Sequence, residues 1–100
     1  VAIQVDGNVS GSAVSTGSFG HVIVGGNIVP TTDNSHNLGS SALRWANVYT
    51  ADFHLSNING APNAVDGTAG SWTIQEGEDK LYLLNNKTKK KYSFVLKEEE

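Results

Sequence analysis

Residues 1–37 combine β-branched apolar residues with many small polar ones; Val1, Ile3 and Val5 alternate along the chain, and Phe19, His21 and Ile23 alternate against Val22 and Val24. Six of the eleven glycines fall in this segment, and it contains no leucine. β-branched residues favour strands, while Asp6-Gly7 and Gly25-Gly26 favour turns between them. The pattern therefore predicts short strand-turn units over residues 1–37.

A strand-turn ribbon with small side chains cannot close a core by itself, because one face and both edges stay unpaired. Three parallel copies wound around one axis would bury the β-branched stripe and pair the edges. Glycine permits the tight turns and close backbone approach that such winding needs. We therefore interpret residues 1–37 as a fibre shaft segment.

Residues 38–62 carry the first bulky aliphatic and tryptophan side chains. Ser40 or Ser41 can cap a short helix over residues 42–46. Residues 49–55 then alternate apolar and polar positions, which predicts a strand that ends before Asn59-Gly60. We expect a small hydrophobic plug with these core residues: Leu38, Leu43, Trp45, Tyr49 and Phe53.

Residues 63–70 are small and polar, and they are interpreted as a linker into a terminal unit, residues 71–100. Strands are predicted over residues 71–76, 80–85 and 91–97, as a three-stranded antiparallel β meander at the tip. Leu84 and Val95 break the alternation, which suggests burial on both faces, as at a subunit interface. The residues expected on one apolar face are Trp72, Ile74, Leu81, Leu83, Tyr92, Phe94 and Leu96.

The fold class predicted from these segments is mostly all-β and fibrous, an intertwined parallel homotrimer with a short helix and the meander tip. Val, Ile, Leu and Phe supply 25 of the 100 residues, enough for some core but marginal for a lone domain. The chain has no cysteine, so disulfides cannot compensate. Because its first residue is Val1, we expect a fragment or a processed product.

Charge and hydropathy exclude two classes of partner. The net charge is −3, and Arg44 is the only Lys or Arg before Lys80, so no extended basic face exists to bind nucleic acid. No apolar stretch approaches the roughly 20 residues of a membrane span, and we expect no membrane insertion. The unpaired strand edges described above make further copies of the chain the expected partners.

Catalytic and metal chemistry have little support in the sequence. The motifs of nucleophile elbows, phosphate-binding loops and zinc hydrolases are absent, so we expect no enzyme and no cofactor. The three histidines lack the spacing that places two ligands on one metal. His21 is the one weak metal candidate, because a histidine facing a trimer axis would become three imidazoles around one point.

Lysines cluster near the C-terminus in a predicted turn. Lys87, Lys89 and Lys90 could contact acidic glycans or anionic headgroups on a cell surface. A solvated hairpin tip, balanced by the glutamates at 98–100, is the alternative. Tyr82, on the presumed outer face, could stack on a sugar ring. These four residues are the receptor-binding candidates.

Two stretches resemble bacteriophage tail-fibre and tailspike proteins. The first carries Leu38-Gly39-Ser40-Ser41, Arg44-Trp45 and Val48-Tyr49-Thr50. The second begins at Trp72-Thr73-Ile74-Gln75-Glu76-Gly77-Glu78 and runs to Lys90-Lys91-Tyr92, and it is similar to C-terminal ends of such fibres. The resemblance implies a parallel homotrimer at the distal end of the fibre, located on the virion and extracellular when it acts. It also implies two partners besides the chain itself, the rest of the fibre and a host cell-surface glycan or protein.

Three functions follow as hypotheses. The first is a structural virion component, a trimeric fibre tip that attaches to a host cell surface. The second is a trimerisation or connector module without receptor contact. The third, with less support, is a fragment of a polysaccharide-degrading tailspike.

Overall fold

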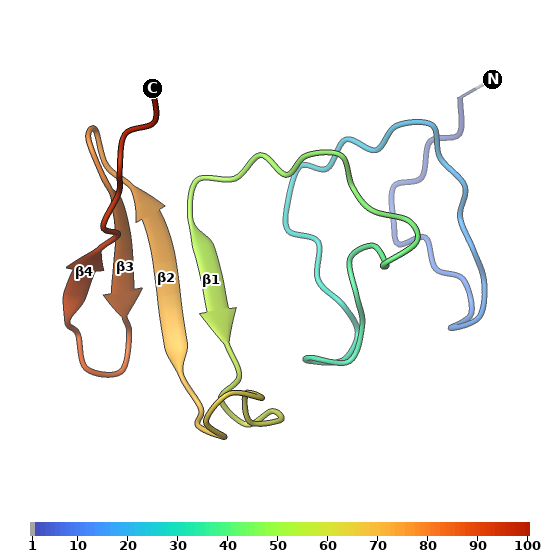
Figure 1. Cartoon of the computed structure of the whole chain (residues 1–100). Helices are drawn as coiled ribbons and strands as arrows, with labels where there is room; N and C mark the ends of the chain where they lie inside the picture. The colour runs from blue at the N-terminus through green and yellow to red at the C-terminus, as the bar shows by residue number, and fades with distance from the viewer. Residues whose placement is uncertain (1) are drawn as a thin grey trace. The chain divides into compact units, whose positions relative to one another are not determined.

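The structure, a computed structural model, describes residues 2–100 and is all-β. Its strands are β1 (Phe53–Ser56), β2 (Ser71–Glu76), β3 (Leu81–Asn85) and β4 (Lys91–Ser93). They form one antiparallel sheet in the order β1-β2-β3-β4 (Figure 1). The chain divides into two compact units, Val1–Thr31 and Thr32–Glu100, and the second contains the sheet.

In the first unit the described residues, 2–31, form no strand. The chain bends at Asp6-Gly7 and at Gly25-Gly26, where the sequence predicts turns. Ser15 N donates a hydrogen bond to Ser12 O at 3.0 Å, which closes a third turn. The predicted strands have no partner strand within a single chain, so the turns form without the ladders.

The predicted short helix is wrong, because residues 2–100 contain no helix. The predicted cap does form. Ser40 Oγ accepts from Leu43 N at 3.0 Å, and Ser40 N donates to Leu43 O at 3.0 Å. These bonds close a single turn, preceded by Gly39 at φ 82°. A helix nucleus fixes several residues for one hydrogen bond, and isolated helices shorter than about 12 residues are marginal.

The three predicted C-terminal strands are present, and a fourth joins them. β1 pairs antiparallel with β2, so that Phe53 lies opposite Ile74. The segment predicted as a linker, residues 63–70, is therefore part of the connection between two strands of one sheet. The predicted strand over residues 49–55 is shorter and shifted, and the last strand ends at Ser93.

The register sorts side chains onto two faces, since residues directly opposite each other in an antiparallel sheet share a face. Ile74 lies opposite both Phe53 and Leu83, and Leu83 lies opposite Tyr92. We call this side the apolar face and the other side the polar face. The apolar face carries Phe53, Leu55, Trp72, Ile74, Leu81, Leu83 and Tyr92, whereas the polar face carries His54, Thr73, Gln75, Tyr82, Leu84, Lys91 and Ser93.

None of the described residues, 2–100, buries the apolar face. Among residues 2–100 no apolar side chain is buried, and the one buried residue is Thr73, which is 3% exposed. The accessible surface is 10110 Å². A folded monomer of 10.6 kDa is expected to expose about 5,500 Å². A single chain thus exposes nearly twice the surface of an ordinary folded domain of its mass.

Thr73 is the centre of a hydrogen-bonded cluster on the polar face. Its Oγ1 lies 2.9 Å from His54 Nδ1, and Asn86 Nδ2 donates to the same oxygen at 3.1 Å. Asn86 Nδ2 also donates to Ser71 Oγ at 3.2 Å, and Asn86 N donates to Ser71 O at 2.8 Å. The cluster joins β1, β2 and the start of the β3–β4 turn.

Thr73→Val should lower the free energy of unfolding by about 1–2 kcal/mol, because it removes the hydroxyl and leaves His54 and Asn86 without this partner. Urea denaturation followed by tryptophan fluorescence measures the change. Thr73→Ser keeps the hydroxyl and is the control. Equal midpoints for the valine variant and the unmodified chain would contradict this role of the cluster.

Candidate functional site

Because the sheet is an antiparallel meander, its successive connecting segments lie alternately at its two ends. The β1–β2 loop, residues 57–70, and the β3–β4 turn, residues 86–90, lie at one end, which we call the loop end (Figure 1). The β2–β3 turn, residues 77–80, lies at the opposite end, where β4 also finishes. The β2–β3 turn and the lysine-bearing β3–β4 turn are therefore separated by the length of the sheet.

The lysine candidates occupy a turn held by local hydrogen bonds. Asn85 Oδ1 accepts from Lys87 N at 3.0 Å and from Thr88 N at 3.2 Å. Asn85 N donates to Lys90 O at 2.9 Å, and Lys89 N donates to Asn85 O at 2.9 Å. Lys89 adopts φ 64°, in the left-handed region that favours glycine. These hydrogen bonds therefore fix the backbone positions of Lys87, Lys89 and Lys90.

Lys87 connects the two parts of the loop end. Its Nζ donates a hydrogen bond to Ala69 O at 3.3 Å, across to the β1–β2 loop. The ammonium group of Lys87 thus lies beside that loop.

The β1–β2 loop is ordered by two asparagines and an aspartate. Asn63 Oδ1 accepts from Val65 N at 2.9 Å and from Asp66 N at 3.0 Å. Asn63 Nδ2 donates to Asp66 Oδ1 at 2.7 Å and to Thr68 O at 2.8 Å. Asn57 fixes the loop base, since its Oδ1 accepts from Gly70 N at 2.7 Å. The loop is therefore a compact hydrogen-bonded structure, which differs from the linker that its composition suggested.

The carboxylate of Asp66 is held in its charged form. Hydrogen bonds from the side chains of Thr68 and Asn63, followed by the backbone N–H of Thr68, lower the pKa of Asp66 from its ordinary value of 3.8. Thr68 Oγ1 donates to Asp66 Oδ1 at 2.7 Å, and Thr68 N donates to it at 3.1 Å. The side chain stays exposed, so it adds a fixed negative charge to the loop end.

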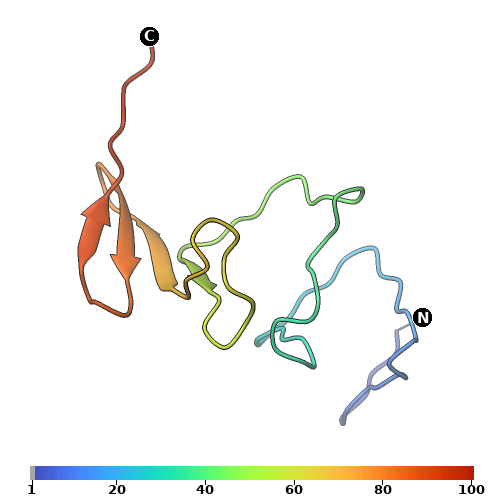
Figure 2. The same ribbon diagram turned by 60° about the horizontal axis from the view of Figure 1, so that its bottom comes forward.

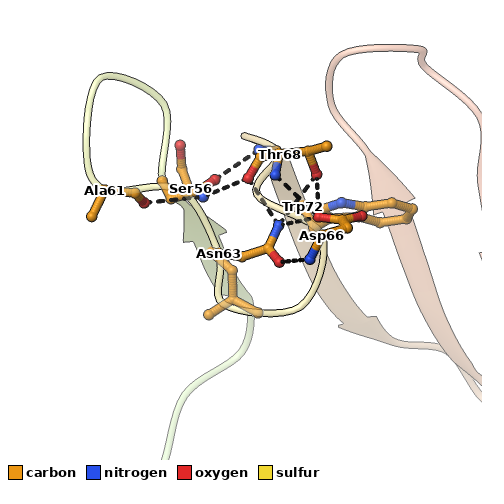
Figure 3. A pocket seen from close by; sticks show the side chains of 9 residues that line it. Ser56, Ala61, Asn63, Asp66, Thr68 and Trp72 are labelled. Atoms are coloured by element: carbon orange, nitrogen blue, oxygen red, sulfur yellow. Dashed lines mark hydrogen bonds between the residues drawn. The ribbon is translucent and has the colours of Figure 1, made fainter.

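A shallow hollow of about 590 Å³ lies between this loop and the sheet (Figure 3). Leu55 and Trp72 form its apolar wall, and Figure 3 shows the Trp72 ring beside Asp66 and Thr68. The ring of Trp72 also packs against Tyr92, with centroids 5.8 Å apart. The lining combines an aromatic wall with amide, hydroxyl and carboxylate groups, which suits contact by hydrogen bonding and packing.

Tyr82 lies apart from the lysines. It is near the start of β3, opposite Gln75 and Ser93 on the polar face. Its ring lies over Gly77, in the turn at the far end of the sheet from Lys87. The structure therefore does not bring the four receptor-binding candidates into one site.

The candidates for the trimer core fall into two groups. Leu38, Leu43, Trp45 and Tyr49 are exposed in the single chain, and the Trp45 ring lies against Gly39. Phe53, Trp72, Ile74, Leu81 and Leu83 are on the apolar face, and Phe94 continues it, since its N donates to Leu81 O at 3.2 Å. Leu96 lies beyond the last paired residue and is exposed. Burial of either group in an assembly stays a prediction.

Residues 2–100 contain neither a cluster of metal-binding side chains nor a membrane-spanning helix. His21 is exposed, and the part of the chain that the structure describes contains no group of three or more His, Cys, Asp or Glu side chains placed to hold a metal ion. In the same residues no helix has the length and apolar character needed to cross a membrane.

Sequence reasoning missed the ordered β1–β2 loop. Its signal was the spacing of Asn63, Asp66 and Thr68 around Gly67, which adopts φ 72°. Short polar side chains at such spacing bond to nearby backbone groups and build turns.

Comparison with protein-family models, with curated proteins and with solved structures gives no match for this chain.

Acid should weaken the sheet partly through Asp66. A lowered pKa in the folded state contributes stability that is present above 3.8 and is lost as the pH falls through the folded value. Urea midpoints measured from about pH 6 to pH 2.5 should therefore fall less steeply for Asp66→Asn than for the unmodified chain. Asp79→Asn, in the β2–β3 turn, is the control and should keep the original slope. Parallel slopes for Asp66→Asn and the unmodified chain would contradict this contribution.

Proposed function

We propose that this chain is the distal part of a bacteriophage tail fibre, a structural virion protein that assembles as a parallel homotrimer and attaches to a host cell surface. The observation that carries the proposal is the uncovered apolar face. A sheet whose apolar residues come from all four strands needs a second layer. The number three and the virion location come from the resemblance to tail fibres.

Self-association is the simplest source of that second layer. Cyclic symmetry places the same surface of each copy toward one axis, so one apolar face per chain is enough to build a shared core. The exposed Leu38, Leu43 and Trp45 and the β-branched residues before Thr31 would enter the same assembly. The excess surface of the single chain is consistent with burial between chains.

Attachment is assigned to the loop end. There the lysine turn and the β1–β2 loop present fixed charges of both signs, and Lys87 spans the two. A trimer would present three copies, so weak contacts to a repetitive glycan or protein surface would gain avidity. Attachment through Tyr82, near the other end, is the alternative position.

A connector without receptor contact is the second candidate function. It is favoured by the polar-face cluster and the ordered β1–β2 loop, which stabilise the sheet and require no ligand. The adsorption experiment below distinguishes it from attachment.

Sedimentation equilibrium should give three times the chain mass of 10.6 kDa. Leu83→Lys places a charge on the apolar face and should dissociate the assembly, because a buried unpaired charge is strongly unfavourable. Ser93→Lys, on the polar face of β4 and exposed, is the control and should remain trimeric. A folded monomer in the unmodified chain would remove the basis of the proposal.

Adsorption of the fluorescently labelled chain to a panel of bacterial strains tests the loop end. The variant Lys87→Ser with Lys89→Gly removes two positive charges, and glycine suits φ 64°. It should stay trimeric and lose most cell binding. Arg44→Ser with Lys80→Ser removes the same charge outside the lysine turn and should bind normally. Equal binding by both variants would favour another site, and no binding by the unmodified chain would favour the connector.

A further inference from the structure

β4 ends where β3 offers no further residue to pair with it. In the β3–β4 ladder Tyr82 lies opposite Ser93, and the Phe94 N to Leu81 O bond of 3.2 Å extends this pairing by one residue. The next partner would be Lys80, but Lys80 O already accepts from Gly77 N at 2.7 Å in the β2–β3 turn. Residues 95–97 therefore have no strand beside them in their own chain, although they continue a strand-forming pattern.

The unpaired tail is apolar and extended. Val95 is fully exposed and Leu96 is 65% exposed. Figure 2 shows the C-terminal residues leading away from β4. Since Phe94 lies opposite Leu81, Phe94 and Leu96 would fall on the apolar face if the extended conformation continued. Such a segment pairs readily with any strand edge that is open.

The sheet has one such edge in β1. β1 pairs with β2 on one side, and no described strand lies on its other side. This edge presents Phe53 and Leu55 on the apolar face, with His54 between them on the polar face. Tail and edge thus offer the same alternation over the same length.

We propose that residues 94–97 of one copy pair with the open edge of β1 in the next copy, so that each chain donates one strand and accepts one. This inference rests on the proposed self-association and specifies its contact. Within the sheet Phe53 is level with Tyr92, so pairing residues 94–97 with β1 of the next copy requires a stagger of about 13 Å, which strands tilted to the symmetry axis supply. β4 runs antiparallel to β1 within the sheet, and rotation about that axis preserves strand direction. The tail therefore meets the neighbouring β1 antiparallel, and the exchange closes a ring.

One register satisfies both the apolar and the charged positions. Phe94 opposite Leu55 and Leu96 opposite Phe53 extend the apolar face of the neighbouring sheet. The same register places Lys97 opposite Asp52, so that opposite charges pair on the polar face. A shift by two residues in either direction separates this charged pair, and one of the two shifts also places Asn57 opposite Phe94 and Glu98 opposite Phe53.

Paired cysteines test the register directly, because the chain has no cysteine of its own. Asp52→Cys with Lys97→Cys should form disulfides between chains, with loss of the monomer band on a non-reducing gel. β1 and β4 are separated by three strand spacings, about 14 Å, so the same pair cannot close within one sheet. Asp52→Cys with Val95→Cys is two residues out of register and should remain mainly monomeric on the gel.

A charge exchange tests the contact without cysteines. Asp52→Lys should lower the temperature at which the assembly dissociates, and adding Lys97→Asp should restore part of the loss. Strand exchange would be overturned if the crosslinks were absent or formed equally in both registers, or if the effects of the two charge changes were purely additive. If sedimentation then still showed an intact assembly, the proposed trimer would stand. A monomer by sedimentation would overturn both.

Discussion

The constraint on which this structure depends is an amphipathic sheet without a second layer. All four strands contribute to one apolar face, and no helix, loop or second sheet of the described chain covers it. Hydrophobic burial is the main favourable term in folding, and the proposed assembly would supply the burial that the single chain lacks. The accessible surface of the single chain, 10110 Å², reflects the same lack of burial, since it is nearly twice that of an ordinary folded domain of this mass.

Within one chain, order comes mainly from polar groups. Thr73 anchors the polar face, Asn57 and Asn63 hold the β1–β2 loop, and Asn85 holds the lysine turn. Net contributions of such bonds are about 1 kcal/mol each, so they define the shape of the sheet better than they stabilise it. The chain is well suited to supply a defined surface and poorly suited to remain alone.

The sequence predicted the C-terminal strands well, because alternation and turn residues between positions 71 and 93 are local signals. It placed Trp72, Ile74 and Leu83 together for the same reason, and the register agrees. The helix failed, since a serine cap signals where a helix can begin and says little about whether it propagates. Two further features were not predicted from the sequence. The pairing of β1 with β2 spans a long loop, and the role of Asp66 depends on how that loop closes.

The topology of the sheet also bears on the order of events in folding. Every strand pairs with its neighbour in sequence, and the widest-separated pair is Phe53 with Ile74. Local pairings form quickly, with hairpins closing in about 1–10 μs, whereas encounters between chains take far longer at ordinary concentrations. Nascent chains would thus sample the sheet transiently before they meet. Assembly of the proposed trimer would then proceed by capture of partly formed sheets, and its rate would depend on how many chains are synthesised close together.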